Sequence, residues 1–206
     1  MAGKDELSEY RRKRDFDRTR EPQGGAPSSG PDPRFVVQLH DARNVHFDFR
    51  LEVDGVLKSW AIPKGPSHDP HDKRLAMPTE DHPLDYRDFE GVIPEGQYGG
   101  GTVIIWDEGT YRPKASPEEF KKALEKGHAS FWLDGRKLRG GYALTRFRGG
   151  DGDDDREAWM LVKRNDSHAS DQDAPDPHRA RSARSGRTLG QIAADPDADR
   201  WESNRS

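Results

Sequence analysis

Apolar and polar residues alternate through the middle of the chain, and this period of two predicts β-strands. Residues 35–40 (FVVQLH) and 45–53 (VHFDFRLEV) flank the turn-rich segment DARN. Asp54-Gly55 then fits a two-residue hairpin that leads into a third strand ending near Ile62. The folded region is therefore expected to begin with a three-strand meander.

Later apolar runs continue the β pattern. Residues 102–106 (TVIIW) and 110–113 (TYRP) lie on either side of Asp107-Glu108-Gly109, which predicts another hairpin. Further strands are expected at residues 128–133, 142–147 and 158–164. We therefore expect a mainly β fold, an open or distorted β-barrel of about eight strands with one or two flanking helices.

One helix has clear boundary signals in the sequence. Ser116 is suited to the N-cap, Pro117 to the first turn, and Glu119 completes a capping box. Phe120 falls on the apolar face, and Gly127 ends the helix. We expect this helix to cover one mouth or face of the sheet.

Hydrophobic side chains concentrate in the centre of the chain. Fifteen of the 18 aromatic residues lie between Phe35 and Trp159, although the hydrophobic content of the whole chain is only 31%. Residues 34–164 are therefore expected to form one β domain. Residues 1–33 form a charged segment with a short helix followed by a flexible connector, and residues 165–206 are expected to be a mostly disordered tail.

Composition and charge narrow the class of protein. There is no cysteine, which excludes disulfides, thiolate metal sites and cysteine nucleophiles. The formal net charge of -4 means that any nucleic acid must be held by local basic residues rather than by the charge of the whole chain. No apolar stretch is long enough to span a membrane, and the polar start lacks a secretory signal, so we expect a soluble cytoplasmic protein with no membrane partner.

The first predicted hairpin places several polar side chains on one face. If its loop spans residues 41–45, His40 faces His46 and Gln38 faces Asp48, with Arg50 on the same face. Directly opposed residues in antiparallel strands have Cβ atoms about 4.5–5.5 Å apart, close enough to share one ion. A lone His on a strand is usually an ordinary solvent-facing residue, but this combination favours a metal site. Two imidazoles and a carboxylate suit Mn²⁺, Fe²⁺, Zn²⁺, Co²⁺ or Ni²⁺ better than Ca²⁺.

A second polar cluster follows in a proline-rich stretch. Five prolines between residues 63 and 83 are expected to exclude long regular elements and to leave an extended, functional loop. The cluster consists of Lys64, Arg74, Glu80, His82 and Tyr86. Its cations suggest contacts with an anion, although solvated charges on a surface loop are equally consistent with any one of these residues.

Two further segments suggest ligand loops but are better interpreted as structural. Residues 91–101 (GVIPEGQYGGG) contain five glycines, yet they lack the lysine of a P-loop and the spacing of a dinucleotide fingerprint. Residues 149–155 (GGDGDDD) lack the closing glutamate of an EF-hand loop, so a solvated hairpin turn is expected there.

Two long stretches carry a resemblance to a known family. QLHDARNVHFDFRLEVDGVLKSWAIPKGPS and RLAMPTEDHPLDYRDFEGVIPEGQYGGGTVIIWDEGTY resemble the 3′-phosphoesterase module of bacterial DNA ligase D, and the resemblance covers nearly all of residues 10–164. It implies a manganese-dependent hydrolase, with cobalt or zinc as other metals, that acts on primer-template 3′ ends during non-homologous end joining. Such an enzyme removes a terminal ribonucleotide and then the 3′-phosphate, leaving a 3′-hydroxyl. A ligase or polymerase of the pathway would be the partner.

The resemblance also implies roles for individual residues. The metal ligands correspond to His40, His46 and Asp48. The other active-site positions correspond to Arg14, Asp15, Glu21, Gln38, Arg50, Lys64, Arg74, Glu80, His82 and Tyr86. His82 is expected to contact the phosphate or to protonate the leaving oxygen. Arg50, Lys64 and Arg74 would neutralise charge on the phosphoryl group.

The ends of the chain also bear on the resemblance. Arg14 would close the pocket if residues 10–21 fold back over the barrel mouth. Residues 185–206 resemble the segment that precedes the ligase domain in multidomain relatives, so we expect a stand-alone or excised module.

Two alternatives remain open from the residues alone. His46-x-Asp48 with a distant His82 also matches the 2-His-1-carboxylate triad of non-haem iron oxygenases. The cation cluster argues against it, because a polyanionic phosphate substrate uses several cations. The other alternative is a non-catalytic DNA-end-binding module, which would not need the His-His-Asp group.

Overall fold

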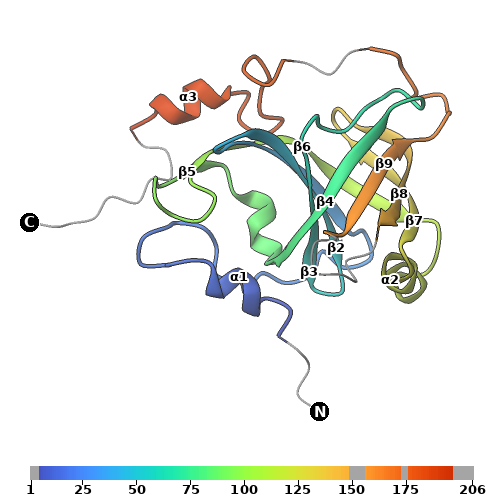
Figure 1. The fold of residues 1–206 in the computed structure, drawn as a ribbon, viewed down its shortest axis with the longest axis horizontal. Coiled ribbons are helices and arrows are strands. Elements are labelled where there is room, and N and C mark those ends of the chain that lie inside the picture. Colours follow the sequence, from blue (N-terminus) through green and yellow to red (C-terminus); the bar gives the residue numbers. More distant parts are fainter. Residues whose placement is uncertain (1–4, 149–155, 173–175, 197–206) are drawn as a thin grey trace, which may run out of the picture.

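The computed structural model describes residues 5–148, 156–172 and 176–196, so the acidic stretch 149–155 lies outside the described residues. The strands are β1 (Arg34–Asp41), β2 (Val45–Val53), β3 (Val56–Ile62), β4 (Lys73–His82), β5 (Gly91–Ile93), β6 (Gly101–Pro113), β7 (His128–Gly135), β8 (Arg139–Arg148) and β9 (Ala158–Lys163). The helices are α1 (Ser8–Arg12), α2 (Pro117–Lys126), α3 (Leu189–Ala194) and the 3₁₀ helix η1 (Leu84–Asp88) (Figure 1).

The strands close into an antiparallel barrel. Their order is β1-β2-β3-β4-β9-β8-β7-β6-β5, and a further pairing between β1 and β6 closes eight of them into a ring, with β5 added outside β6. This confirms the expected mainly β fold of about eight strands with flanking helices. The barrel is closed rather than open, because β1 pairs with β6 over nearly its whole length.

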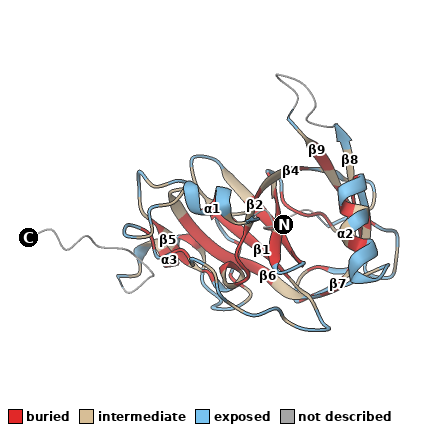
Figure 2. Cartoon of the chain, turned by 90° about the horizontal axis from the view of Figure 1, so that it is seen from below, coloured by how far each residue is buried: buried red, intermediate tan, exposed pale blue. Residues whose placement is uncertain are grey.

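Side-chain alternation sorts the first two strands into an inner and an outer face. Leu39, Phe47 and Phe49 point into the main core and are almost fully buried. The opposite face is also largely buried (Figure 2), because η1, β5 and the N-terminal segment cover it. Tyr10 and Tyr86 belong to this second, smaller apolar cluster. The N-terminal segment therefore lies on the outside of the barrel wall, not over the barrel mouth as expected.

The predicted hairpin at Asp107-Glu108-Gly109 is wrong. β6 runs without interruption through these residues and pairs with β1 as far as Thr110, while β7 pairs with its opposite edge from Gly109 onward. Gly109 pairs with both strands, and a Cβ atom there would lie 2.1 Å from the carbonyl oxygen of Asp134. The Asp107 carboxylate accepts hydrogen bonds from the backbone of residues 136–138. Asp107 and Gly109 are thus needed for close packing against residues distant in the sequence. Asp and Gly are also common in turns, which is why the sequence pattern predicted a hairpin here.

The predicted proline-rich loop is also partly wrong, because it contains the ten-residue strand β4. Residues 73–76 pair with β9, whereas Met77, Pro78 and Thr79 pair with β3. Pro78 lies beyond the last residue paired with β9, so its missing N–H removes no ladder hydrogen bond on that side. This strand brings Glu80 and His82 to the outer face of the wall.

The segment after residue 164 differs from the mostly disordered tail that was expected. Within its described part, Ala180, Leu189 and Ile192 are buried against the main core. Ala183 donates its N–H to the carbonyl oxygen of Ile105, at the edge formed by β5 and β6. Few apolar residues are enough here because they cover a surface that the barrel already provides.

The predicted helix is confirmed as α2. Ser116 and Glu119 form the capping box, and Gly127 ends the helix with a φ of 89°. Phe120 and Leu124 are buried against the barrel. Among the described residues, no helix has both the length and the apolar character required to cross a membrane.

Candidate active site

The β1–β2 register places the predicted metal-binding residues together. His40 pairs with His46 and Gln38 pairs with Asp48, as the alternation predicted. His40 Nδ1 lies 3.6 Å and His46 Nε2 lies 3.5 Å from Asp48 Oδ2. One ligand atom from each of the three residues lies within 4.8 Å of the others, so this group could bind a metal ion.

Backbone carbonyl groups orient the two imidazole rings. His40 Nε2 donates to the carbonyl oxygen of Gly99 at 2.7 Å, and His46 Nδ1 donates to that of Asn44 at 2.9 Å. Because carbonyl oxygens only accept, the other nitrogen of each ring faces Asp48 with its lone pair when the ring is neutral. Three electron-rich atoms therefore converge on one point, and fixed second nitrogens of this kind are typical of metal-binding histidines.

The charge of Asp48 is held by its neighbours. Burial raises the pKa of this carboxyl, but the positive charge of Arg50 and hydrogen bonds with His40 and His46 outweigh burial and hold the pKa well below its usual value. Burial lowers the pKa of His46, whereas its hydrogen bond and charge interaction with Asp48 raise it, and the net shift is upward. The group thus attracts a cation, either a proton or a metal ion.

Arg50 is fixed by a buried amide. Its Nε donates to Gln38 Oε1 at 2.7 Å, and its Nη1 donates to Ser59 Oγ at 2.9 Å. Gln38 Nε2 in turn donates to the backbone carbonyls of Tyr86 and Phe89, which sets the amide orientation. The remaining Arg50 Nη2 lies 3.4 Å from Asp48 Oδ2, so the guanidinium is presented beside the metal-binding group.

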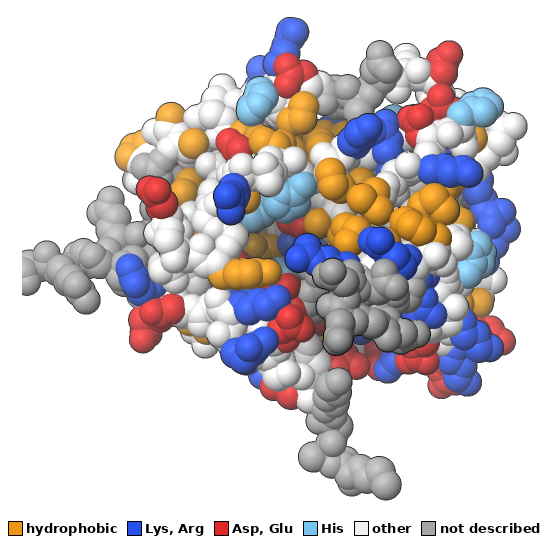
Figure 3. Space-filling model, in the orientation of Figure 1, with side chains coloured by type: hydrophobic (Ala, Val, Ile, Leu, Met, Phe, Trp, Pro, Cys, Tyr) orange, Lys and Arg blue, Asp and Glu red, His pale blue; other side chains and the backbone are white. Residues whose placement is uncertain are grey.

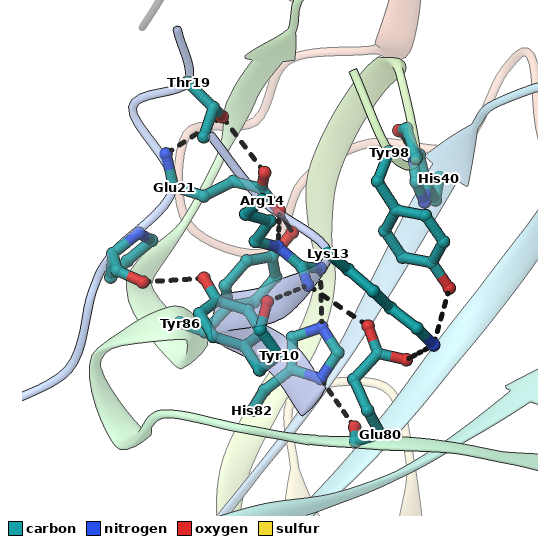
Figure 4. A network of polar contacts seen from close by, with 12 residues as sticks. Tyr10, Lys13, Arg14, Thr19, Glu21, His40, Glu80, His82, Tyr86 and Tyr98 are labelled. Atoms are coloured by element: carbon teal, nitrogen blue, oxygen red, sulfur yellow. Dashed lines mark hydrogen bonds and ion pairs between the residues drawn. The ribbon is translucent and has the colours of Figure 1, made fainter. Parts of the chain in front are cut away.

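His82 lies across the cavity from this group and is neutral. Its Nε2 is 3.3 Å from Arg14 Nη2, and because arginine only donates, Nε2 accepts while Nδ1 donates to the carbonyl oxygen of Glu80 at 2.9 Å (Figure 4). Burial lowers the pKa of His82 well below its usual value, and the charges of Arg50 and Arg14 lower it further. His82 therefore takes no part in the His-His-Asp group found among the described residues.

A buried ion-pair network fastens the N-terminal segment to the site. Arg14 Nε lies 2.9 Å from Glu21 Oε1, and Arg14 Nη1 lies 3.1 Å from Glu80 Oε1. Glu21 also accepts hydrogen bonds from the hydroxyls of Tyr86 and Thr19, each at 3.0 Å. Figure 4 shows these side chains meeting between the N-terminal segment, η1 and β4. The network brings Arg14 to the cavity, 68 residues before its partner His82.

The His-His-Asp group and the Arg14–His82 pair line one cavity of about 260 Å³. Its lining residues are Arg14, His40, Ala42, His46, Asp48, Arg50, Ala61, Thr79, Glu80, His82, Tyr86, Ile93, Tyr98 and Gly99. On the molecular face drawn in Figure 3, Lys and Arg side chains are interspersed with hydrophobic ones around a His near the centre. The cavity thus combines a group that could bind a metal ion with local cations, and this combination suits an anionic ligand.

Five of the expected site residues are not among those that line this cavity. Two of them, Gln38 and Glu21, form hydrogen bonds with the lining residues Arg50 and Arg14. The other three lie elsewhere. Asp15 is exposed, and its carboxylate accepts the N–H of Asp17 within a turn. Lys64 is exposed just after β3, at the end of the barrel near His46, as the β2–β3 register shows. Arg74 lies on β4 with Nη2 bonded to Asp72 at 3.1 Å and with a buried Nε that has no hydrogen-bond partner.

Sequence reasoning missed several residues that the structure brings to the cavity. Tyr98 and Gly99 come from the glycine-rich segment, which was interpreted as structural. Lys13 reaches Glu80 Oε2 at 3.3 Å, and Thr79 lines the wall. The five glycines around Tyr98 were the available signal, because they permit close approach of backbone to a ligand or to another strand.

Comparison with known proteins gives a consistent result. Residues 38–146 match the family model described as the DNA ligase D 3′-phosphoesterase domain. The chain is 51% identical over 195 residues to the multifunctional non-homologous end joining protein LigD of Pseudomonas aeruginosa, covering 92% of this chain and 22% of that protein. It is 49% identical over 146 residues to the multifunctional non-homologous end joining DNA repair protein LigD of Mycobacterium tuberculosis, covering 70% of this chain and 19% of that protein. The chain thus spans about a fifth of the length of these relatives.

Proposed function

This chain belongs to the family of DNA ligase D 3′-phosphoesterase domains, and we propose that it is a metal-dependent phosphoesterase that processes DNA 3′ ends. The observation that carries the proposal is the convergence of His40, His46 and Asp48 on one side of a cavity, with Arg50 beside them and with Arg14 and His82 on the other side. A group that could hold a metal ion, with cations beside and opposite it, supplies the charge stabilisation that metal-dependent phosphoester hydrolysis uses.

Two successive reactions are proposed. On a strand ending in a ribonucleotide, water adds to the terminal phosphodiester and the P–O5′ bond breaks, which releases a ribonucleoside and leaves a 3′-phosphate. In the second reaction, water adds to that phosphomonoester and the P–O3′ bond breaks, which releases inorganic phosphate and leaves a 3′-hydroxyl. Both steps are hydrolyses, so no oxidant or further cosubstrate is needed.

His40, His46 and Asp48 would hold the metal ion, for which we propose manganese, with cobalt or zinc as substitutes. When bound, the ion would supply a Lewis acid that polarises a non-bridging phosphate oxygen and lowers the pKa of a coordinated water. The donor set fits such an ion, because two imidazoles with fixed orientation and one carboxylate leave further coordination positions open. Arg50, held by Gln38, would add a positive charge beside the bound phosphate.

His82 is proposed to move a proton at Nε2. In the structure this atom accepts from Arg14, and burial together with the two arginines keeps the imidazole neutral. A phosphate bound between His82 and Arg14 would add negative charge, which raises the pKa of His82 and allows Nε2 to take up a proton. The protonated ring could then donate to the phosphate or to the leaving oxygen.

Arg14 would contact the phosphate while Glu21 and Glu80 hold its guanidinium in place. Tyr86 supports the same network, since burial and then Glu21 raise the pKa of its hydroxyl well above the usual value and keep it a donor. Lys64 and Arg74, which lie outside the cavity lining, are proposed to serve a phosphate with greater charge. Asp15 is proposed to order the turn that presents Arg14.

The natural context proposed for this activity is end joining in the cytoplasm, with primer-template 3′ ends as substrate and a ligase or polymerase as partner. The named relatives are multifunctional end-joining proteins, and this chain matches about a fifth of their length. His82 forms hydrogen bonds with Arg14 and Glu80, so it is not the second histidine of the iron oxygenase alternative. The argument against that alternative is the pair of cations, Arg14 and Arg50, that line the cavity and suit a phosphate substrate.

The test is incubation of the full chain with a primer-template ending in one 3′ ribonucleotide, with manganese or with a chelator, resolved on a sequencing gel. We expect manganese to yield first a 3′-phosphate product and then a 3′-hydroxyl product, and the chelator to abolish both. His46→Ala should behave like the chelator. DNA binding without any cleavage in manganese, cobalt or zinc would instead support the non-catalytic end-binding module.

A further inference from the structure

Tyr98 is a large aromatic side chain left exposed at the edge of the active-site cavity. Its exposed fraction is 47%, and the other large hydrophobic side chains exposed among the described residues are Leu75 and Phe147. Single exposed hydrophobic residues are common on protein surfaces and need no special explanation. Tyr98 differs because, unlike Leu75 and Phe147, it lines the cavity that contains the metal-binding group.

The loop that carries Tyr98 has a defined geometry. Gln97 donates its N–H to the carbonyl oxygen of Pro94, and Gly100 donates to that of Gln97. Gly99 has a φ of 72°, and a Cβ atom at Gly100 would lie 2.9 Å from the oxygen of Pro94. These contacts specify the loop backbone without using the Tyr98 side chain. The ring is therefore presented by its backbone and is not required to hold the loop together.

The surroundings of the ring connect it to both halves of the site. The carbonyl oxygen of Gly99, the next residue, holds His40 at 2.7 Å. Lys13 Nζ lies 5.0 Å and the Arg14 guanidinium carbon lies 5.3 Å from the centre of the Tyr98 ring. Figure 4 shows Tyr98 beside His40, with its hydroxyl pointing to Lys13. An aromatic face next to cations is how proteins hold unpaired nucleotides, through base stacking and charge.

The size of the cavity indicates which part of the substrate reaches Tyr98. If the scissile phosphate lies between the His-His-Asp group and Arg14, one neighbouring unit of the strand must lie at the cavity edge. A duplex is far too wide for a space of about 260 Å³ that the N-terminal segment covers on one side. A single terminal nucleoside is small enough, and the duplex can then stay outside.

We propose that Tyr98 is a stacking platform for the base of the terminal ribonucleoside, the group that leaves in the diester reaction. This inference rests on the proposed function and adds a specificity-determining residue to it. The 3′-phosphate substrate of the second reaction has lost this nucleoside, so the platform favours the first reaction over the second. Stacking tolerates every base, so the platform does not select a sequence.

The test compares Tyr98→Ala, Tyr98→Phe and the wild-type chain on two ends of the same primer-template, one with a terminal ribonucleotide and one with a 3′-phosphate. Base–aromatic stacking of about 1–3 kcal/mol corresponds to a loss of about five- to 150-fold. We expect Tyr98→Ala to lower the ratio of diester to monoester kcat/KM by this factor, chiefly through KM. Tyr98→Phe should keep the wild-type ratio. Phe147→Ala, which removes an exposed ring away from the cavity, is the matched control.

Two further measurements separate stacking from other effects. On an end with a terminal abasic ribose, kcat/KM of the wild-type chain should be lower than on the ribonucleotide end by the same factor. On that abasic end, Tyr98→Ala should have the same kcat/KM as the wild-type chain. With a terminal 2-aminopurine ribonucleotide in chelator, binding by wild type and Tyr98→Phe should quench the fluorescence, whereas binding by Tyr98→Ala should not. The stacking proposal would be wrong if Tyr98→Ala lowered kcat/KM equally on the ribonucleotide and 3′-phosphate ends. It would also be wrong if Tyr98→Ala lowered kcat/KM on the abasic end. A wild-type chain that cleaves neither end would overturn the proposed function itself.

Discussion

Replacing Glu21 with Gln removes one charge from the buried network that fastens the N-terminal segment over the site. The side chain of Glu21 is fully buried and has three partners: Arg14 at 2.9 Å, Tyr86 at 3.0 Å and Thr19 at 3.0 Å. Glutamine has nearly the same shape, and its single amide oxygen can take the place of Oε1 and still accept from Arg14 and Tyr86. The Thr19 hydroxyl, which donates to Oε2, must then turn to accept from the amide NH2. The change therefore removes chiefly the charge interaction with Arg14.

The size of the loss in stability depends on which ion-pair partners Arg14 keeps after the substitution. Glu80 remains 3.1 Å from the guanidinium, so the positive charge is not stranded in Glu21→Gln. A hydrogen bond to a charged group contributes about 1.5–3 kcal/mol, and we expect a loss of about 2 kcal/mol. Arg14→Met leaves the buried Glu21 carboxylate without its cation, whereas Glu80 keeps Lys13 at 3.3 Å. Removing one partner of a buried pair costs about 3–5 kcal/mol. The arginine variant should thus be the less stable one.

The measurement is urea unfolding at pH 7, followed by tryptophan fluorescence, for both single variants and for the double variant. The double variant should lose less than the sum of the single losses by about 0.5–3 kcal/mol, because the two side chains contact each other directly. Hydrogen exchange of residues 8–12 reports whether the segment detaches locally before the barrel unfolds. Two results would refute the idea that ion pairs hold the N-terminal segment on the barrel. One is that the two losses in the free energy of unfolding are additive, and the other is a larger loss for Glu21→Gln than for Arg14→Met.

Three further predictions concern charge, pH and backbone packing. Lys64→Ala and Arg74→Ala should weaken 3′-phosphate removal more than diester cleavage, because a phosphomonoester carries about -1.5 to -2 charge and a diester carries one; equal losses in parallel rate assays would contradict this. The pKa of His82 is lowered in the folded state, so below about pH 6.5 the unfolded state binds a proton that the folded state does not. The free energy of unfolding therefore decreases as the pH falls below about 6.5, by up to about 1.4 kcal/mol per pH unit. His82→Gln should flatten this part of the pH–stability curve, and an unchanged slope in urea melts at pH 5.5 and 7.5 would count against a neutral buried His82. Gly109→Ala should destabilise the barrel and lower its melting temperature, because its Cβ would lie 2.1 Å from a carbonyl oxygen of β7, and an unchanged melting curve would show that β6 can shift at no cost.

Local sequence patterns were reliable where neighbours in the sequence are neighbours in space. The register that pairs His40 with His46 follows from one hairpin loop and the two-residue period of a strand. The capping box of Ser116 and Glu119 likewise involves residues three positions apart. For both features, the interacting groups are so close along the chain that the rest of the fold has little influence on their geometry.

The same patterns failed where distant contacts decide the local structure. Gly109 is a turn-forming residue type, but it lies inside β6 because another strand passes too close for a side chain. Pro78 normally interrupts a sheet, but it is accommodated in β4 where the pairing changes partner. Leu189 and Ile192 are too few to form a core of their own, and they are buried because the barrel supplies the opposing surface.

The sequence by itself therefore determined the mainly β class, the hairpin that carries His40, His46 and Asp48, and the α2 helix, since each depends on short-range periodicity or capping. Only the tertiary structure decided that the candidate site lies on the outer wall of the barrel and that Arg14 and Tyr98 line the same cavity as the His-His-Asp group. These contacts join residues that are many tens of positions apart. Their geometry is set by barrel closure and by burial of paired charges, which no local pattern encodes.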